Sequence, residues 1–216
     1  MAKLALVAAI VFVLLLLAEY MWRIAKLHTE ITRKFIHITV GTFVAFWPWI
    51  LNWGQIELFS IVFLLAIVLA RSITVLSRVF TIFGSVHIIG RKTVGELFFA
   101  MAIGGVALIT HNQWVYMAAI LHLSAADGLA AIVGTQFGKR FPYKVFGQSK
   151  TLLGTTTFFV VSVTIIAVYF HFSHAPEFWP TIIGLPLAAT ALENIGARGS
   201  DNLLVPLAVA TVLQLV

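Results

Sequence analysis

Residues 114–137 read WVYMAAILHLSAADGLAAIVGTQF, and this stretch decides the fold class. It is apolar almost throughout and is longer than the roughly 20 residues that an α-helix needs to cross a bilayer. Asp127 lies inside this apolar run. A charged side chain at such a position is costly and is usually functional. The segment therefore predicts a membrane-spanning helix with a functional carboxylate.

Seven further runs have the same apolar character, at about 4–22, 35–51, 56–76, 94–110, 151–170, 178–195 and 202–216. Hydrophobic residues make up 61% of the 216-residue chain and charged residues only 10%, whereas a soluble domain carries about 25% charged residues. A bilayer is the solvent that suits such a chain. We predict an all-α, polytopic integral membrane protein with about seven or eight transmembrane helices, built as a single domain over residues 1–216.

The loops between the runs alternate sharply in charge. Of the 14 basic residues, all except Lys3 fall on one side of the predicted bundle. The positive-inside rule assigns that side to the cytoplasm and both chain termini to the outside. This distribution explains the net charge of +6 without a nucleic-acid partner. We therefore expect a multi-pass protein of the cell inner membrane or an endomembrane.

Two further sequence features limit the possibilities. The chain has no cysteine, which excludes a disulfide framework and a thiolate metal site. In the first apolar run, no small-x-small cleavage site precedes Glu19, and the positive charge follows the run instead of leading it. We therefore expect this run to remain as a helix and not to be cleaved as a signal peptide.

Most of the remaining acidic and amide side chains lie toward the predicted cytoplasmic ends of the runs. Glu193 and Asn194 lie near the end of the seventh run, and Asp201 and Asn202 open the eighth. Ordinary explanations exist for some of them. Asp201 suits the N-cap of the last helix, and Asp127 suits a structural ion pair with a neighbouring helix. The residues alone leave these alternatives open beside a functional site.

The loop after the fifth run, within residues 134–155, is rich in glycines, hydroxyl groups and cations, which together favour phosphate binding. It is not a Walker A loop, which needs G-x-x-x-x-G-K-[ST] after a strand. Gly134 and Gly138 are one residue too close, and Arg140 stands where a hydroxyl belongs. These glycines also form a small-xxx-small pair of the kind that packs helices, and the cations alone suit an ordinary cytoplasmic loop.

Arg33, Lys34 and His37 form a second basic group at the start of the second run. Arg33 and His37 are four residues apart and therefore share one helix face at the predicted membrane surface. They suit either an interfacial anchor or part of a site. No spacing typical of a metal site occurs among five other histidines: His87, His111, His122, His171 and His174.

Four motifs then occur in the order and spacing of a known family. They are Arg33-Lys34-Phe-Ile-His37; Arg91-Lys92-Thr-Val-Gly95-Glu96; Asp127-Gly-Leu-Ala130, continued by Gly134, Gly138-Lys139 and Ser149-Lys150-Thr-x-x-Gly154; and Glu193 followed by Ser200-Asp201-Asn202-Leu-Leu-Val-Pro206. From residue 32 to 207 the chain resembles the CTP-dependent lipid-alcohol kinases, which comprise dolichol kinase, phytol kinase and the CTP-dependent diacylglycerol kinases. It departs from their pattern at Ser200, which replaces the first acid of the usual D-D-N.

The resemblance implies transfer of the γ-phosphate from CTP to the hydroxyl of a membrane lipid alcohol, with Mg²⁺ as cofactor. It implies that Asp127 and Asp201 bind the metal, and that Glu193 or His37 orients or deprotonates the hydroxyl near Arg33. The residues that it assigns to the nucleotide are Lys139, Ser149, Lys150, Thr151, Gly134, Gly138, Gly154 and Asn202. The lipid, whether polyprenol or dolichol, phytol-like or diacylglycerol, stays open, as does the formation of a homo-oligomer.

Two other functions compete with this interpretation. The third motif is shared with the phosphatidate cytidylyltransferases, so cytidylyl transfer to a phospholipid is the nearest alternative. A small transporter or scramblase is the alternative from a different class. Transport predicts polar residues through the full span, whereas the outer halves of these runs carry almost no charge. The sequence thus favours a one-sided active site that faces the cytoplasm.

Overall fold

The stretch 114–137 forms the central helical column of the structure, which is a computed structural model. The structure describes residues 2–23, 29–72, 94–176 and 179–216. The column consists of α6 (Gln113–Leu121), a π-helical turn η2 (His122–Ala126) and α7 (Asp127–Phe137). All side chains of residues 115–120 are buried. A helix that is apolar on every side must be surrounded by other elements, and α6 accordingly occupies the middle of the bundle.

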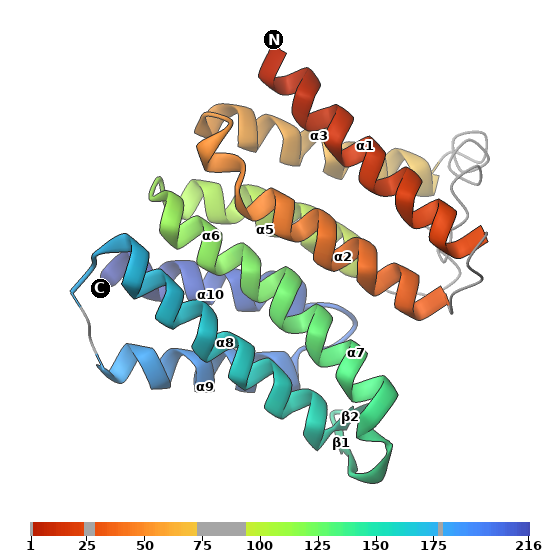
Figure 1. Cartoon of the computed structure of the whole chain (residues 1–216), viewed down its shortest axis with the longest axis vertical. Coiled ribbons are helices and arrows are strands. Elements are labelled where there is room, and N and C mark those ends of the chain that lie inside the picture. Colours follow the sequence, from red (N-terminus) through yellow and green to blue (C-terminus); the bar gives the residue numbers. More distant parts are fainter. Residues whose placement is uncertain (1, 24–28, 73–93, 177–178) are drawn as a thin grey trace.

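The other elements pack around this column (Figure 1). The helices on the N-terminal side are α1 (Ala2–Arg23), α2 (Thr29–Ala45), the short η1 (Trp47–Trp49), α3 (Trp53–Ser72) and α5 (Gly95–Ile109). After α7 come η3 (Gly138–Arg140), β1 (Pro142–Val145), β2 (Gln148–Thr151), α8 (Leu152–Ser173), α9 (Trp179–Ile195) and α10 (Asp201–Leu215).

The predicted apolar runs coincide with these helices, so the described residues are mostly helical, as predicted; the strands β1 and β2 are the exception. The end of the third run, residues 73–76, lies outside them. By length and composition, two of the described helical stretches could cross a membrane: Gln113–Arg140 and Leu152–Ser173. The apolar parts of α1, α3, α5 and α10 are shorter. Seven or eight spans therefore stay a prediction.

The outer faces of the bundle carry large apolar side chains. Phe12 on α1 is 52% exposed, and Leu58 and Val62 on α3 are 55% and 53% exposed. An exposed apolar surface of this extent marks a region that contacts another apolar phase or partner. The arrangement is the one expected of helices that face lipid.

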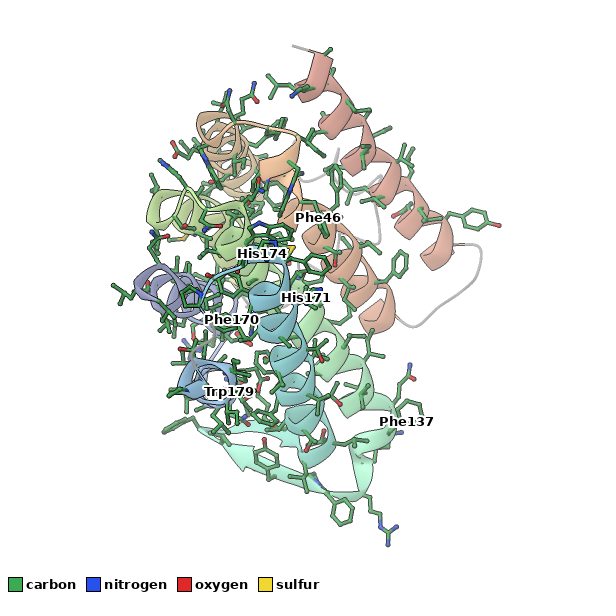
Figure 2. The ribbon with its side chains drawn as sticks, turned by 60° about the vertical axis from the view of Figure 1, so that its left-hand side comes forward. Phe46, Phe137, Phe170, His171, His174 and Trp179 are labelled. Carbon is green, nitrogen blue, oxygen red and sulfur yellow. The ribbon has the colours of Figure 1, made fainter. Side chains whose placement is uncertain are left out.

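The helices place two different sets of loops at opposite ends of the bundle. In Figure 1 both chain termini lie at one end, while the β-hairpin and the start of α10 lie at the other. Figure 2 shows Phe46, Phe170, His171 and His174 at the first end, and Phe137 near the hairpin. Aromatic rings pack together at the first end, with 5.0 Å between the ring centroids of Trp49 and Trp114 and 5.8 Å between those of Trp114 and Phe172.

The β-hairpin was not predicted from the sequence. Strands β1 and β2 pair antiparallel, with Tyr143 opposite Lys150 and Lys144 opposite Ser149. The two turn residues, Phe146 and Gly147, both have positive φ. This is the conformation of a type I′ turn, whose twist matches that of the paired strands. The hairpin holds the predicted phosphate loop in a defined shape at the end of α7.

Candidate active site

Asp127 follows directly on the π-helical turn of the central column. The backbone N–H of Asp127 donates to the carbonyl of His122, five residues earlier, which is the hydrogen bond that defines a π-helix. Within the turn, Ser124 Oγ donates to the carbonyl of Ile120 at 2.9 Å. Such back-bonding of a hydroxyl bends helices, and π-turns occur frequently at functional sites. The distortion therefore marks the position of Asp127 as unusual within an otherwise regular helix.

Helix α2 approaches the central column closely through two glycines. A Cβ atom on Gly41 would lie 2.4 Å from Ser124 Cβ, and one on Gly128 would lie 2.2 Å from Ile38 Cγ1. No side chain larger than hydrogen fits at either position without movement of its neighbour. This contact brings the beginning of α2 against Asp127.

Two side chains of α2 contact the Asp127 carboxylate as a result. Lys34 Nζ donates to Asp127 Oδ2 at 2.8 Å. His37 Nε2 lies 3.2 Å from the same oxygen and 2.8 Å from the carbonyl oxygen of Leu123. Because a carbonyl oxygen only accepts, Nε2 carries the hydrogen. The side chain of His37, a predicted site residue, is thus oriented by Asp127 and the carbonyl of Leu123. The side chain of Arg33 lies outside the described part of the structure, so its predicted role stays a prediction.

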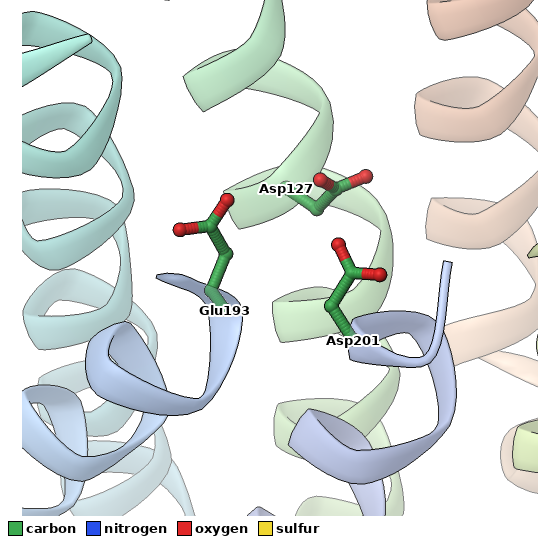
Figure 3. A group of neighbouring side chains, drawn as sticks. All are labelled: Asp127, Glu193 and Asp201. Carbon is green, nitrogen blue, oxygen red and sulfur yellow. The ribbon is translucent and has the colours of Figure 1, made fainter. Parts of the chain in front are cut away.

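Three carboxylates from three helices converge at this point (Figure 3). Asp127 begins α7, Glu193 lies in the last turn of α9, and Asp201 begins α10. One oxygen of each lies within 4.8 Å of the others. Asp201 is the first residue of α10 and Ser200 holds the N-cap position, so the N-cap explanation of Asp201 is wrong. Carboxylates repel one another at this distance unless cations compensate them.

A second lysine reaches the cluster from the hairpin. Lys150 Nζ donates to Glu193 Oε1 at 2.5 Å and to the backbone carbonyl of Glu193 at 3.0 Å. Side-chain hydrogen bonds fix the hairpin in this place: the Tyr143 hydroxyl bonds Thr155 and Asn194. The hairpin therefore holds the Lys150 ammonium group at the end of α9.

A narrow pocket, too small for a water molecule in this structure, lies between the cluster and the apolar core. Its polar lining consists of the three carboxylate residues with His122 and Asn202, and its apolar lining of Leu123, Phe158 and Val205. Two buried atoms at this pocket have no hydrogen-bond partner among the described residues, Glu193 Oε2 and His122 Nε2. Buried polar atoms are nearly always paired in proteins, so each orphan calls for an explanation.

The donor set fits a divalent cation. Among the described residues, two lysines face three carboxylates, so negative charge is in excess within this set when all three acids are ionised. Mg²⁺ prefers carboxylate oxygens together with water and phosphate oxygens. A cation bound between Asp127, Glu193 and Asp201 would also give Glu193 Oε2 a partner. Glu193 would then be a third carboxylate ligand beside Asp127 and Asp201.

Comparison with known proteins identifies the family. No family model and no solved structure matches the chain. The phytol kinase of Synechocystis sp. is 34% identical to it over 208 residues, which cover 91% of this chain and 84% of that protein. The chain belongs to the lipid-alcohol kinase family. This finding confirms the resemblance that the four motifs indicated.

The glycines of the third motif lie at a close helix contact. A Cβ atom on Gly138 would lie 2.4 Å from Thr151 Oγ1, and one on Gly134 would lie 2.9 Å from it. Thr151 caps α8 by accepting from the N–H of Gly154 at 3.2 Å. These contacts support the packing explanation of Gly134 and Gly138. A role of these glycines and of Thr151 toward a nucleotide stays a prediction.

The remaining motif residues of the lipid-alcohol kinase fall into three groups. Lys139 and Ser149 are exposed beside the hairpin, where a nucleotide would meet them from solution. Asn202 Nδ2 donates to the carbonyl of Gly95 at 3.1 Å and so joins the fourth motif to the second. Arg91 and Lys92 of the second motif lie outside the described residues.

Two residues at the site had no role assigned to them from the sequence. Lys34 was quoted in the first motif without a role, although its three-residue spacing from His37 places both on one helix face. His122 lies five residues before Asp127, and in a regular α-helix side chains at this spacing point to different faces. Only the π-turn brings it to the pocket.

Proposed function

We propose that this lipid-alcohol kinase transfers the γ-phosphate of CTP to the hydroxyl of a phytol-like isoprenoid alcohol. The observation that carries the proposal is the convergence of Asp127, Glu193 and Asp201, faced by two lysines, in a chain of this family. Phosphoryl transfer depends chiefly on positioning and on neutralisation of charge. A cluster of acids and lysines at one end of a rigid bundle suits both tasks.

Asp127, Glu193 and Asp201 are proposed to hold Mg²⁺. When bound there, the ion would neutralise phosphate charge and help to position the nucleotide. The sequence motifs suggested Glu193 as a proton acceptor for the lipid. Its ion pair with Lys150 and its unpartnered Oε2 at the carboxylate cluster favour a ligand role instead.

Cations of the chain are proposed to bind the nucleotide phosphates. Lys150 lies at the cluster, and Lys139 and Ser149 are exposed on the same side of the bundle. Charge-assisted hydrogen bonds from such groups are the usual means of phosphate recognition. CTP is favoured over ATP because the third motif resembles that of CTP-using enzymes and no Walker A loop is present.

The lipid is proposed to reach the site from a bilayer that surrounds the bundle. The apolar outer faces of α1 and α3 suit contact with lipid chains. Glu193 and Asp201 lie at the ends of α9 and α10, toward the level of lipid headgroups, and Asp127 lies beside them within the central column. The relative is a phytol kinase, which favours an isoprenoid alcohol. The positive-inside rule places this end of the bundle in the cytoplasm, where CTP is available.

A single assay tests the proposal. The purified protein in detergent micelles is incubated with Mg²⁺, γ-labelled CTP and, in turn, phytol, a polyprenol, dolichol and diacylglycerol. We expect labelled lipid phosphate from phytol, faster with CTP than with ATP, and lost on addition of EDTA. Label transferred from α-labelled CTP would instead identify cytidylyl transfer. Absence of any labelled lipid with every alcohol would overturn the kinase assignment.

A further inference from the structure

His122, one of the residues that line the pocket beside the carboxylate cluster, has an unused hydrogen-bond acceptor. Its side chain is fully buried, and Nδ1 lies 2.8 Å from the carbonyl oxygen of Ala118. Because a carbonyl oxygen only accepts, Nδ1 must carry the hydrogen. In the neutral imidazole the other nitrogen, Nε2, then has a lone pair and no hydrogen. Nε2 has no partner among the described residues.

The π-turn explains why His122 lines the same pocket as Asp127. In an α-helix with 3.6 residues per turn, positions five apart point about 140° away from each other. The wider turn of η2, with its bond from the Asp127 N–H to the His122 carbonyl, brings the two positions closer in direction. Both side chains accordingly line one pocket. A regular helix would turn His122 away from the acids.

The kinds of residue that line the pocket suit an alcohol with an apolar tail, and these side chains must move apart to admit one. Leu123, Phe158 and Val205 give it apolar walls, whereas the acids lie on its polar side. Mg²⁺ prefers oxygen ligands, so an imidazole nitrogen is not the ligand that such an ion requires. A hydroxyl group, by contrast, can donate its hydrogen to Nε2 while its oxygen faces the phosphate-binding side.

We propose that His122 Nε2 accepts the hydrogen bond of the substrate hydroxyl and thereby selects an alcohol over its methyl ether, which has no hydrogen to donate. This inference rests on the proposed function, because it assigns the position of the lipid hydroxyl at that same site. A site built to pair with a hydroxyl rejects an analogue without the hydrogen, since its own buried polar group is then left unpaired.

The test compares the equilibrium binding of phytol with that of phytyl methyl ether, which cannot donate a hydrogen bond. Binding is measured on the full-length protein in detergent by displacement of radiolabelled phytol, without nucleotide. For the unmodified protein we expect phytol to bind roughly three- to tenfold more tightly than the ether. His122→Asn retains an amide near Nδ1 and removes Nε2, so this preference should disappear. His122→Gln places an acceptor near Nε2 and should retain part of it.

Tyr116 provides the matched control, because its hydroxyl on α6 is also buried without a partner but does not line the pocket. Tyr116→Phe should keep the preference of the unmodified protein. If His122→Asn does not fold, His122→Phe, which keeps a ring, replaces it. A folded His122→Asn or His122→Phe protein that still prefers phytol to the ether as strongly as the unmodified protein would overturn the inference. A variant that binds Mg²⁺ more weakly but keeps this preference would overturn it as well. The proposed function fails separately, through the absence of lipid phosphorylation by the unmodified protein.

Discussion

Lys34 Nζ lies 2.8 Å from Asp127 Oδ2, and the two side chains are only 11% and 15% exposed. The structural ion pair that the sequence left open for Asp127 therefore exists. It does not explain why Glu193 and Asp201 lie beside the pair. A purely structural ion pair and a metal site lead to different expected effects when Lys34 or Asp127 is replaced.

Removal of the Lys34 cation should destabilise the protein in a manner that Mg²⁺ partly reverses. Lys34→Met leaves Asp127 beside two other carboxylates, and loss of one partner from a buried ion pair costs about 3–5 kcal/mol of unfolding free energy. A divalent cation at the cluster would supply positive charge again, so Mg²⁺ should stabilise Lys34→Met more than the unmodified protein. Thermal unfolding in detergent, with and without Mg²⁺, measures both effects.

The matched control for this experiment is Lys3→Met, which removes an exposed lysine from α1. We expect it to change neither the unfolding temperature nor the response to Mg²⁺. Equal stabilisation of all three proteins by Mg²⁺ would contradict a link between the ion and the Asp127 cluster.

The close contact between α2 and α7 should be necessary for activity. In Gly128→Ala the new methyl group would lie 2.2 Å from Ile38 Cγ1, so α2 must move and carry Lys34 and His37 away from Asp127. Overpacking of this kind costs about 1–3 kcal/mol of stability. We expect lipid phosphorylation per folded molecule to fall at least about tenfold, because a small misplacement at an active site has a large effect on rate.

Gly184→Ala is the corresponding control, since a Cβ atom there meets nothing within 4 Å. Replacement of a helical glycine without strain should stabilise the protein by about 0.4–1 kcal/mol and leave activity unchanged. If Gly128→Ala were as active as Gly184→Ala, the contact would have no role in positioning the site.

Labelling of single cysteines should establish the orientation in the membrane. The chain has no cysteine, so Lys144→Cys in the hairpin and His174→Cys at the opposite end provide unique labels. The positive-inside rule predicts that an impermeant maleimide reaches position 174 but not position 144 from outside intact cells. The reverse pattern would place the acid cluster outside and exclude cytosolic CTP as its donor.

The helices were largely predictable from the sequence because apolar length is a local property. The run 151–170 became α8 over Leu152–Ser173, and the run 94–110 became α5 over Gly95–Ile109. The hairpin was missed because its turn begins with Phe146, a residue that seldom adopts positive φ. The sequence offered no typical turn signal at that position.

The candidate site was predictable only in part. Asp127 stood out because it is a charge within an apolar run, and Asp201 because of its motif. The contribution of Glu193 to the same cluster depends on how α9 packs beside α10, which no local pattern reveals. The position of His122 depends on the π-turn, which changes the direction of side chains along the helix.

The most direct test of the central claim is the rate of lipid phosphorylation by Asp127→Asn. This change keeps the shape of the side chain and removes its charge. We predict a folded protein whose turnover with CTP and phytol falls by at least about a hundredfold. Loss of one preorganised electrostatic contact at a reaction centre raises the activation free energy by about 2.7–4 kcal/mol. Turnover is expressed per folded molecule, with thermal unfolding measured on the same sample. A well-folded Asp127→Asn protein with near-normal turnover would contradict the account.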